Sequence, residues 1–327
     1  MTEPMNPSRR TIVAGLAACA MPARAVSAPV MAALAAKTSP LAFVVVGDWG
    51  RDGASHQQDV ADQMGRTAAA TASRFTVTVG DNFYPAGVQT TTDPKWLTSF
   101  EHIYGAPALQ GPWYGVLGNH DYRGNPDAQI AYAATGSRWR MPARYYTQSS
   151  VTPDGQAIDM FMIDTSPMVR RYAAGSEDAV IRDNVRSQDV PAQLRWLDAA
   201  LAKSTAPWKI VFGHHPVFSG GSAHGSTPEL IADVKPLLES HGVQMYVSGH
   251  DHDLQHLVVD GITYVCTGAG SETRPVKPIA GSQFCSDRSG FTAYRLAGDQ
   301  LTVDFIDYTG AILHTAFVAR DRLRQAA

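Results

Sequence analysis

The sequence predicts an α/β domain, and three patterns along the chain lead to this class. Short apolar runs rich in β-branched residues recur between residues 41 and 248, and each ends in a small or polar residue followed by charged and polar side chains. Such runs are typical of buried strands that lead into loops. Segments with helical features separate most of these runs, and residues 262–319 contain mostly short strand-like runs and turns. We therefore expect one domain in which strands and helices alternate, followed by a strand-rich C-terminal third.

Five apolar runs predict the strands that lead into the most polar loops. They cover residues 41–46, 75–79, 113–117, 209–212 and 244–248. Glycine and a few Asp, Asn or His residues follow each run at its carboxyl end. Because open α/β sheets place their binding sites at the carboxyl ends of strands, we expect these polar clusters to converge on one functional site.

Helices are predicted in the intervals between these strands. Pro191 is typical of a first helical turn, and Pro236 should bend or end a helix because proline lacks the N–H that an internal turn requires. The four predicted helical segments are residues 56–72, residues 96–100 after a capping signal at Asp93-Pro94, residues 191–202, and a segment that begins at Thr227-Pro228.

The composition of the 327 residues is that of a globular protein, with 44% hydrophobic and 17% charged residues and a formal net charge of −3. An acidic balance gives no general attraction to nucleic acid. No apolar run after residue 40 approaches the roughly 20 residues that a membrane span needs. We therefore expect neither a nucleic-acid partner nor a membrane span. An anionic substrate would have to be attracted by local positive charge, which a bound metal ion could supply.

The N-terminal segment resembles an export signal. Arg9-Arg10 precedes a weakly apolar run, and Ala-x-Ala-like cleavage sequences follow. We interpret residues 1–28 as a twin-arginine-type signal peptide and residues 29–40 as a flexible segment, so that the twin-arginine machinery would export the protein to the periplasm or beyond. Two alternatives stay open: a disordered N-terminus with a chance arginine pair, and a lipoprotein anchored through Cys19.

Cleavage of that signal would leave two cysteines, Cys266 and Cys285. An oxidising compartment permits a disulfide between them. Cys266, however, lies in an apolar strand-like run and could simply be buried. The sequence leaves this choice open. Neither cysteine belongs to a Cys-x-x-Cys pattern, so a zinc ribbon or a redox dithiol is not expected.

The polar clusters together contain a set of metal-ligating side chains. Taken singly, each cluster is more typical of a turn, but five of them at five strand ends point to a shared pocket. Oxygen and nitrogen donors without a thiolate suit Fe(III), Mn(II), Zn(II) or Mg(II). Seven donors are too many for one tetrahedral ion, whereas a carboxylate that bridges two ions accommodates them. The seven donors are Asp48, Asp81, Tyr84, Asn119, His214, His250 and His252.

In this order, the five clusters resemble the sequence blocks of the purple acid phosphatases, which are calcineurin-like metallophosphoesterases. The small, tartrate-resistant mammalian-type enzymes are the most similar, and the resemblance extends from about Leu41 to about Tyr308. It implies a four-layer α/β/β/α sandwich in which two mixed sheets are flanked by helices, with residues 41–320 as a single monomeric domain. The blocks are Gly47-Asp48-Trp49-Gly50, Gly80-Asp81-Asn82-Phe83-Tyr84, Gly118-Asn119-His120-Asp121, Gly213-His214-His215-Pro216 and Gly249-His250-Asp251-His252.

The resemblance also implies how two ions would be held. By the family pattern, Asp48, Tyr84 and His252 are ligands of a ferric ion. Asn119, His214 and His250 are ligands of a divalent ion (Fe, Zn or Mn), and Asp81 bridges the two. Gly50 stands where most metallophosphoesterases have a ligand histidine. Tyr84 takes over that role, and its hard phenolate favours Fe(III) and gives the purple colour.

The implied activity is that of an exported acid phosphatase, which hydrolyses phosphate monoesters by in-line attack of a metal-bound hydroxide. His120 and His224 are the candidate catalytic residues. Either could stabilise the phosphoryl group or protonate the leaving alkoxide, which favours mildly acidic pH. The alternative is that they only hydrogen-bond the loops. His215 departs from the family pattern, which usually has tyrosine there, so its effect on the pH optimum stays open.

Other functions remain possible on the same residues. A phosphodiesterase or a nucleotide phosphatase with a dinuclear Zn or Mn centre is the nearest alternative, and a non-catalytic phosphate-binding protein is a more distant one. The presence of both His120 and His224 argues against the latter. The charged segment 168–190 resembles a loop that partly covers the site in the mammalian-type enzymes, although a solvated loop is equally consistent with its composition. The sequence leaves the physiological substrate and the divalent ion open.

Overall fold

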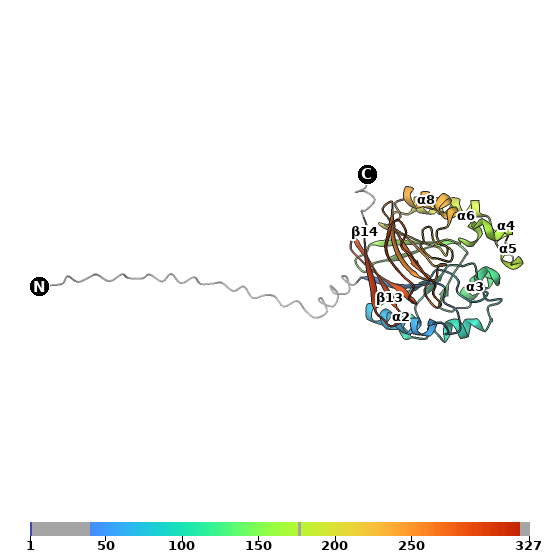
Figure 1. Ribbon diagram of the computed structural model, residues 1–327, viewed down its shortest axis with the longest axis horizontal. Coiled ribbons are helices and arrows are strands. Elements are labelled where there is room, and N and C mark those ends of the chain that lie inside the picture. Colours follow the sequence, from blue (N-terminus) through green and yellow to red (C-terminus); the bar gives the residue numbers. More distant parts are fainter. Residues whose placement is uncertain (2–39, 176–177, 321–327) are drawn as a thin grey trace. The chain divides into compact units, whose positions relative to one another are not determined.

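Two mixed β-sheets of seven strands each form the framework of the computed structural model, which describes Met1 and residues 40–175 and 178–320 (Figure 1). In sheet 1, β1 to β4 run parallel, and β12 to β14 add an antiparallel edge. Its spatial order is β14 (Ile312–Ala319), β13 (Gln300–Asp307), β12 (Gly290–Ala297), β1 (Leu41–Val46), β2 (Thr76–Thr78), β3 (Trp113–Gly115) and β4 (Trp139–Arg140).

Sheet 2 has a parallel centre and antiparallel edges. Strands β6, β7, β8 and β10 run parallel, whereas β5, β9 and β11 pair in the antiparallel sense. Its spatial order is β11 (Ser282–Ser286), β9 (Leu254–Val259), β10 (Ile262–Thr267), β8 (Met245–Ser248), β7 (Trp208–Phe212), β6 (Ala157–Met162) and β5 (Tyr146–Val151).

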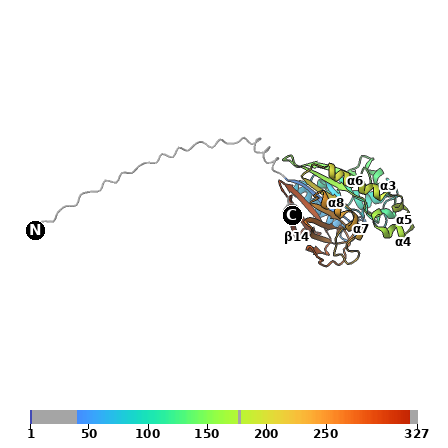
Figure 2. The same cartoon turned by 90° about the horizontal axis from the view of Figure 1, so that it is seen from above.

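Helices cover the outer faces of both sheets and complete the four layers expected from the resemblance. Helix α2 contacts β1 and β12 of sheet 1, and α6 and α8 lie on the opposite side of the strands (Figure 1). Both views place α3, α4 and α5 at the end away from β14 (Figure 2). The helices are α2 (Gln57–Thr71), α3 (Pro126–Ala133), α4 (Arg170–Gly175), α5 (Ala179–Arg186), α6 (Val190–Lys203), α7 (Pro228–Asp233) and α8 (Lys235–Ser240). None of the described helices is long and apolar enough to cross a membrane.

The core consists of two apolar clusters that follow these layers. The larger one joins α2, sheet 1 and inner strands of sheet 2, and Phe43, Val60 and Met160 are among its fully buried members. The smaller one lies between sheet 2 and the helices α6 to α8, where Leu197 and Leu201 pack. Both leucines lie in the helical segment 191–202 that the sequence predicted.

The five strands predicted to carry the polar loops are confirmed as β1, β2, β3, β7 and β8, the second and third being shorter than expected. They are divided between two sheets, three in sheet 1 and two in sheet 2. The four predicted helical segments are also present. Residues Trp96–Glu101 form a π-helical turn, and the segment that begins near Thr227 breaks at Val234, two residues before Pro236.

Cys266 and Cys285 are free thiols in the structure. Both pair in register with Gln255, Cys266 from β10 and Cys285 from β11, so the two cysteines lie two strands apart across β9. Two strand spacings amount to roughly 9.5 Å, which exceeds the roughly 7 Å between Cα atoms that a disulfide can span. The sheet therefore resolves the choice that the sequence left open in favour of unpaired cysteines. Cys19 and the segments 2–28 and 29–39 lie outside the described residues.

Candidate metal centre

The polar loops meet where the carboxyl ends of β1, β2 and β3 face those of β7 and β8. Three of the predicted ligands there have left-handed backbone angles, with φ of 59° at Asp48, 49° at Asp81 and 67° at His250. Residues with a Cβ rarely adopt this conformation, and it costs of the order of 1–3 kcal/mol each. Strain of this kind persists where surrounding contacts fix the chain, and it is concentrated at functional sites.

Four of the predicted ligands form a first group around the phenol of Tyr84. Its hydroxyl oxygen lies 3.1 Å from Asp48 Oδ1, 3.0 Å from Asp81 Oδ2 and 3.1 Å from His252 Nε2. Asp48 Oδ1 is also 3.5 Å from His252 Nε2. All four side chains are buried. The structure therefore brings together the residues expected to hold the ferric ion.

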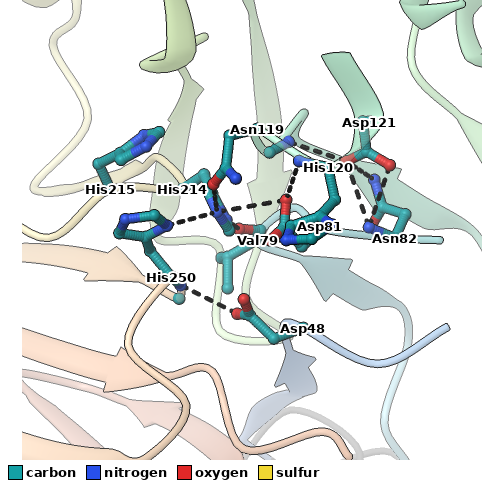
Figure 3. Close-up of polar contacts among 12 residues, drawn as sticks. Asp48, Val79, Asp81, Asn82, Asn119, His120, Asp121, His214, His215 and His250 are labelled. Carbon is teal, nitrogen blue, oxygen red and sulfur yellow. Dashed lines mark hydrogen bonds and ion pairs between the residues drawn. The ribbon is translucent and has the colours of Figure 1, made fainter. Parts of the chain in front are cut away.

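The second group surrounds His214 (Figure 3). His214 Nε2 lies 3.1 Å from Asn119 Oδ1, 3.2 Å from His250 Nδ1 and 3.4 Å from Asp81 Oδ1. The other ring nitrogen, Nδ1, donates to the carbonyl of Val79 at 2.9 Å, which leaves the lone pair of Nε2 directed at the group. Asp81 thus belongs to both groups, with one carboxylate oxygen facing each.

This spacing fits two metal ions. Ligand atoms about 2.1 Å from an octahedral ion and at right angles to each other lie about 3.0 Å apart. The measured separations of 3.0 to 3.5 Å between donor atoms are close to that value. The donors are carboxylate, phenol, amide and imidazole groups, which suit hard or borderline ions. The residues present could therefore hold a dinuclear centre.

The electrostatics of the buried acids also favour bound cations. Burial raises the pKa of Asp48 and of the Tyr84 phenol well above their usual ranges, and the neighbouring carboxylates add to the effect on Tyr84. The pKa of Asp81 is held below its usual range, because His214 and His120 outweigh the opposing effect of burial. Burial lowers the pKa of His214, but Asp81 and Asp48 raise it to about 9. Three acidic groups are thus buried together, and they favour a cation at this place, either a proton on His214 or a bound metal ion.

Two glycines in the predicted motifs allow the carboxylates to approach. A Cβ on Gly118 would lie 2.2 Å from Asp81 Oδ1, and one on Gly249 would lie 2.3 Å from Asp48 Oδ2. Both distances are far below van der Waals contact. Each motif therefore places glycine directly before a predicted ligand because an acidic side chain from another strand packs against that backbone.

The two candidate catalytic histidines lie at the mouth of the site. The backbone N–H of His120 donates to Asp81 Oδ1 at 2.7 Å, and its Nδ1 donates to the Pro85 carbonyl at 2.7 Å, which directs Nε2 toward Asp81, 3.9 Å from Oδ2. The ring of His224 stacks on His250 with 4.1 Å between centroids. Burial lowers the pKa of both histidines, and Arg171 and Arg274 help to lower that of His224 to about 4.

Two carboxylates position these loops and were not singled out from the sequence. Asp121 accepts hydrogen bonds from the backbone N–H groups of Asn82 and Gly118, so it ties two of the ligand loops together (Figure 3). Asp251 accepts from the backbone N–H groups of His224 and Gly225 and holds that loop beside His250. Both residues lie inside the sequence motifs that contain the predicted ligands, and their place in those motifs could have identified them as positioning residues.

A cavity of about 400 Å³ opens over the centre and is lined by arginines as well as by predicted ligands. Arg123, Arg171 and Arg274 all contribute to its wall. Arg171 lies within the charged segment 168–190, whereas Arg123 and Arg274 belong to no motif or charged segment that the sequence singles out. No spacing pattern marks a single arginine, so only the folded structure shows that the three converge.

The segment 168–190, expected as an exposed loop, is partly helical and reaches the site through α4. The hydroxyl of Tyr172 lies 3.0 Å from His215 Nε2, and His215 Nδ1 lies 2.8 Å from Thr165 Oγ1. Both ring nitrogens of His215 are therefore occupied, although the ring is close to His214 and His250. His215 anchors the covering helix in this structure. This contact accounts for a histidine at the position where the resembling enzymes usually have tyrosine.

Comparison with known proteins gives consistent matches. Residues 41–254 match the family described as calcineurin-like phosphoesterase. The chain is 37% identical over 289 residues to purple acid phosphatase 7 of Arabidopsis thaliana, a match that covers 86% of each protein. It is 33% identical over 297 residues to tartrate-resistant acid phosphatase type 5 of Homo sapiens, covering 84% of this chain and 90% of the human protein.

Among solved structures, the fold is similar to that of GAP50, described as the anchor in the inner membrane complex of Plasmodium. The TM-score is 0.72 at 26% identity, and the match covers 86% of this chain and 89% of that one. A protein described as an anchor thus has this fold, so an argument about chemistry has to rest on the side chains of the site.

Proposed function

Because the chain belongs to the purple acid phosphatases of the calcineurin-like phosphoesterase family, and is therefore a metal-dependent phosphoester hydrolase, we propose that it hydrolyses phosphate monoesters at an Fe(III)–M(II) pair. One observation carries the proposal. Seven buried donors lie in two groups that share Asp81, with His120 and His224 beside them. Two ions and two proton-transferring groups at one cavity are what phosphate ester hydrolysis requires.

The donor set supports the assignment of the metals. The first group contains Asp48, Tyr84 and His252, and a phenolate is a hard anionic ligand that stabilises Fe(III) over divalent ions. The second group contains Asn119, His214 and His250, neutral donors that suit a divalent ion such as Fe, Zn or Mn. When bound, the ions would supply Lewis acidity for the phosphoryl oxygens and an activated water as nucleophile.

The side chains around the cavity have separate tasks in this proposal. The residues that line it include no Ser, Thr or Cys among those the structure describes. Water is the nucleophile in this proposal. His120 and His224 face the space where a phosphate would lie. The negative charge of a bound phosphate would oppose the effects that lower their pKa values, and it would favour the imidazolium that can protonate a leaving alkoxide.

The first test is a visible absorption spectrum of the purified, metal-loaded protein beside that of Tyr84→Phe. We expect a broad visible band from phenolate-to-iron charge transfer in the wild type and its loss in the variant. A colourless wild-type protein that is replete with metal and active would contradict the ferric assignment and favour a Zn or Mn centre, while it would leave the hydrolase proposal intact.

The substrate class needs a second comparison. Nitrophenyl phosphate should be hydrolysed much faster than bis-nitrophenyl phosphate if the enzyme is a monoesterase, and the reverse order would favour a phosphodiesterase. His120→Ala and His224→Ala should each lower kcat by roughly 10²-fold or more, which is typical of lost general acid–base catalysis. Unchanged turnover in both variants would show that neither histidine takes part in the proton transfer, whereas absence of hydrolysis by the metal-loaded wild type would point to a binding protein of the same fold.

We also propose that residues 1–28 are an export signal and that residues 41–320 form the mature catalytic domain, active as a monomer in the periplasm or outside the cell. The paired arginines Arg9-Arg10 support the twin-arginine route. The intact mass of the exported protein tests this, because cleavage after Ala28 predicts an N-terminus at Pro29, whereas a lipid on Cys19 would give a heavier, membrane-bound form.

A further inference from the structure

Three arginines from separate parts of the chain meet at the cavity over the proposed centre. Arg123 ends the 3-10 turn Asp121–Arg123, Arg171 lies on α4, and Arg274 lies in the loop after β10. Each guanidinium has a nitrogen 3.3 Å from a ring nitrogen of a histidine of the site. The three contacts join Arg123 to His120, Arg171 to His250, and Arg274 to His224.

The positive charge of this group is largely uncompensated. Within residues 40–175 and 178–320, Arg171 and Arg274 form no ion pair with a carboxylate, and Arg171 donates to the neutral hydroxyl of Tyr172. Arg123 has one such partner, Asp178, at 3.6 Å. Among the residues that the structure describes, Asp81 is the only acidic one in the wall of the cavity, and it is already assigned to the two ions. A nearby arginine shows the contrast, since Arg51 pairs with Glu272 at 3.1 Å.

Binding of an ion would also free one of these arginines. His250 directs Nδ1 toward the second ligand group, and its Nε2 lies next to Arg171. An imidazole that uses Nδ1 as a metal ligand carries its proton on Nε2, and a protonated nitrogen cannot accept a hydrogen bond. Within the described part of the chain, Arg171 would then keep the Tyr172 hydroxyl as its one hydrogen-bond partner, and its remaining N–H groups would be available at the cavity wall.

There is room for more than one anionic group. The cavity of about 400 Å³ adjoins a second one of about 370 Å³, and the two share Arg171, His224 and His250 in their walls. Guanidinium groups bind phosphate and carboxylate through two parallel N–H bonds, and Arg remains charged at any pH the enzyme would meet. Together with two metal ions and two histidines, three guanidinium groups supply more positive charge and more hydrogen-bond donors than a single phosphate with a neutral leaving group needs.

We propose that Arg123, Arg171 and Arg274 form a second anion-binding subsite, which makes the enzyme prefer phosphate monoesters that carry a further phosphate or carboxylate group close to the scissile one. The inference rests on the proposed function, since it names the substrate class of the same site. The alternative use of these arginines, stabilising the scissile phosphate itself, makes a different prediction, because it would affect all phosphate monoesters equally.

The kinetic test compares matched substrates on the metal-loaded enzyme. The pairs are 3-phosphoglycerate against glycerol 3-phosphate, and fructose 1,6-bisphosphate against fructose 6-phosphate. We expect kcat/KM to be about tenfold higher for the doubly anionic member of each pair at low ionic strength, as charge-assisted contacts of this kind allow, and the ratio to fall as salt is added. The two pairs separate a carboxylate from a phosphate as the preferred second group.

Substitutions of the arginines test whether these residues cause the preference for the doubly anionic substrate. Arg171→Gln and Arg274→Gln should each lower the ratio severalfold, the double variant should bring it close to one, and Arg171→Lys should restore part of it because it keeps the charge. Arg170→Gln is the matched control. Arg170 is the exposed neighbour on α4 and lines neither cavity, so this variant should leave the ratio unchanged.

A binding measurement gives a readout that does not depend on turnover. By calorimetry, phosphonoacetate should bind the wild type more tightly than ethylphosphonate, and this difference should shrink in the Arg171→Gln, Arg274→Gln double variant. A wild-type ratio near one, or an equal loss for every substrate in the variants, would overturn the subsite and leave the phosphatase proposal standing. Absence of hydrolysis of all four esters would refute the proposed function instead, and calorimetry would then decide on the subsite alone.

Discussion

Single residues set the geometry of the centre through backbone angles that are uncommon for side-chain-bearing residues. Asp48, Asp81 and His250 all have positive φ, and glycines at positions 118 and 249 leave space for the two carboxylates. The polar residues also alternate with buried aromatic ones. Trp49 and Phe83 follow ligand or loop residues and pack edge to face at 5.4 Å beneath the site. The loops are thus held by the core while their polar side chains face the proposed metal centre.

Asp164 is a buried acid that is not among the proposed ligands, and the pH dependence of stability tests its protonation. Asp164 is almost fully buried, and burial raises its pKa to about 7 although Tyr122 and Arg144 oppose the effect. The folded protein therefore keeps this proton up to about pH 7, whereas the unfolded chain releases it near pH 4. Between these values the folded state binds more protons, so the stabilising contribution of the protonated group is present at low pH and is lost as pH rises.

Asp164→Asn should remove this pH dependence. Raising the pH from 5 to 8 should lower the free energy of unfolding of the wild type by up to about 3 kcal/mol more than that of the variant. Urea unfolding of the metal-loaded proteins at both pH values measures it. Asp127→Asn, at an exposed carboxylate that pairs with Arg144, is the control with the same change of charge. Parallel pH profiles for wild type and Asp164→Asn would contradict the assignment.

At the scale of elements, a chain of hydrogen bonds is one of the contacts that hold the short helix α4 over the site, beside the bond from Arg186 Nε to the Ala173 carbonyl. Tyr172 bonds to His215, His215 to Thr165, and the hydroxyl of Thr165 accepts from the backbone N–H of His215 at 3.0 Å. Arg171, the next residue on the helix, donates to the Tyr172 hydroxyl at 3.1 Å. The position of Arg171, which lines the cavity, therefore depends on Tyr172, whose hydroxyl also bonds to His215.

Tyr172→Phe should consequently affect substrate binding more than catalysis. We expect KM for 3-phosphoglycerate to rise about threefold, in line with loss of a single hydrogen bond of roughly 0.5–1.5 kcal/mol, while kcat changes less. Steady-state kinetics with 3-phosphoglycerate and glycerol 3-phosphate measure the effects on KM and on kcat separately. Tyr145→Phe makes the same change at a ring that packs at a tilt against Trp196 and does not line the cavity, and it should leave both constants as they are. A fall in kcat with an unchanged KM would show that Tyr172 does not act by positioning Arg171.

Periodicity and turn residues were enough to predict most elements. The strands β1, β7 and β8 and the helices α2 and α6 lie within a few residues of the predicted ranges, because each is a continuous apolar or amphipathic run with a clear end. The π-helical form of Trp96–Glu101 could not be predicted, since the hydrogen-bond pattern of a short turn depends on its packing. The helical character of segment 168–190 was missed because its charged residues are equally typical of a solvated loop.

At the scale of the whole molecule, the proposed ligands come from both sheets. Asp48, Asp81, Tyr84 and Asn119 follow strands of sheet 1, and His214, His250 and His252 follow strands of sheet 2. Periodicity predicted these strands but did not indicate that they belong to two sheets. The expectation of two sheets rested on the resemblance of the motifs alone. The seven side chains could be predicted because each lies in a motif. The three arginines could not, because the tertiary fold alone brings Arg123, Arg171 and Arg274 together.

Ions held by both sheets should stabilise the entire domain. Ligands present at about a thousand times their dissociation constant stabilise a protein by about 4 kcal/mol, so removal of both metals should lower Tm by roughly 10 °C. Scanning calorimetry before and after treatment with a chelator, and again after Fe and Zn are returned, measures the shift. Asp81→Asn, which alters the side chain shared by both groups, should show a smaller effect of the chelator. An identical Tm with and without metal would mean that the ions do not link the two sheets.

The order of the ligands along the chain also has a consequence for synthesis. The first group lacks its last member until His252 has been made, and the second lacks its last member until His250, about 200 residues after Asp48. At roughly 5–20 residues per second, this interval lasts about 10–40 s on the ribosome. Both groups then become complete within two residues of each other. A chain shorter than 252 residues has neither full set of proposed ligands, so uptake of both ions cannot come before the synthesis of His252.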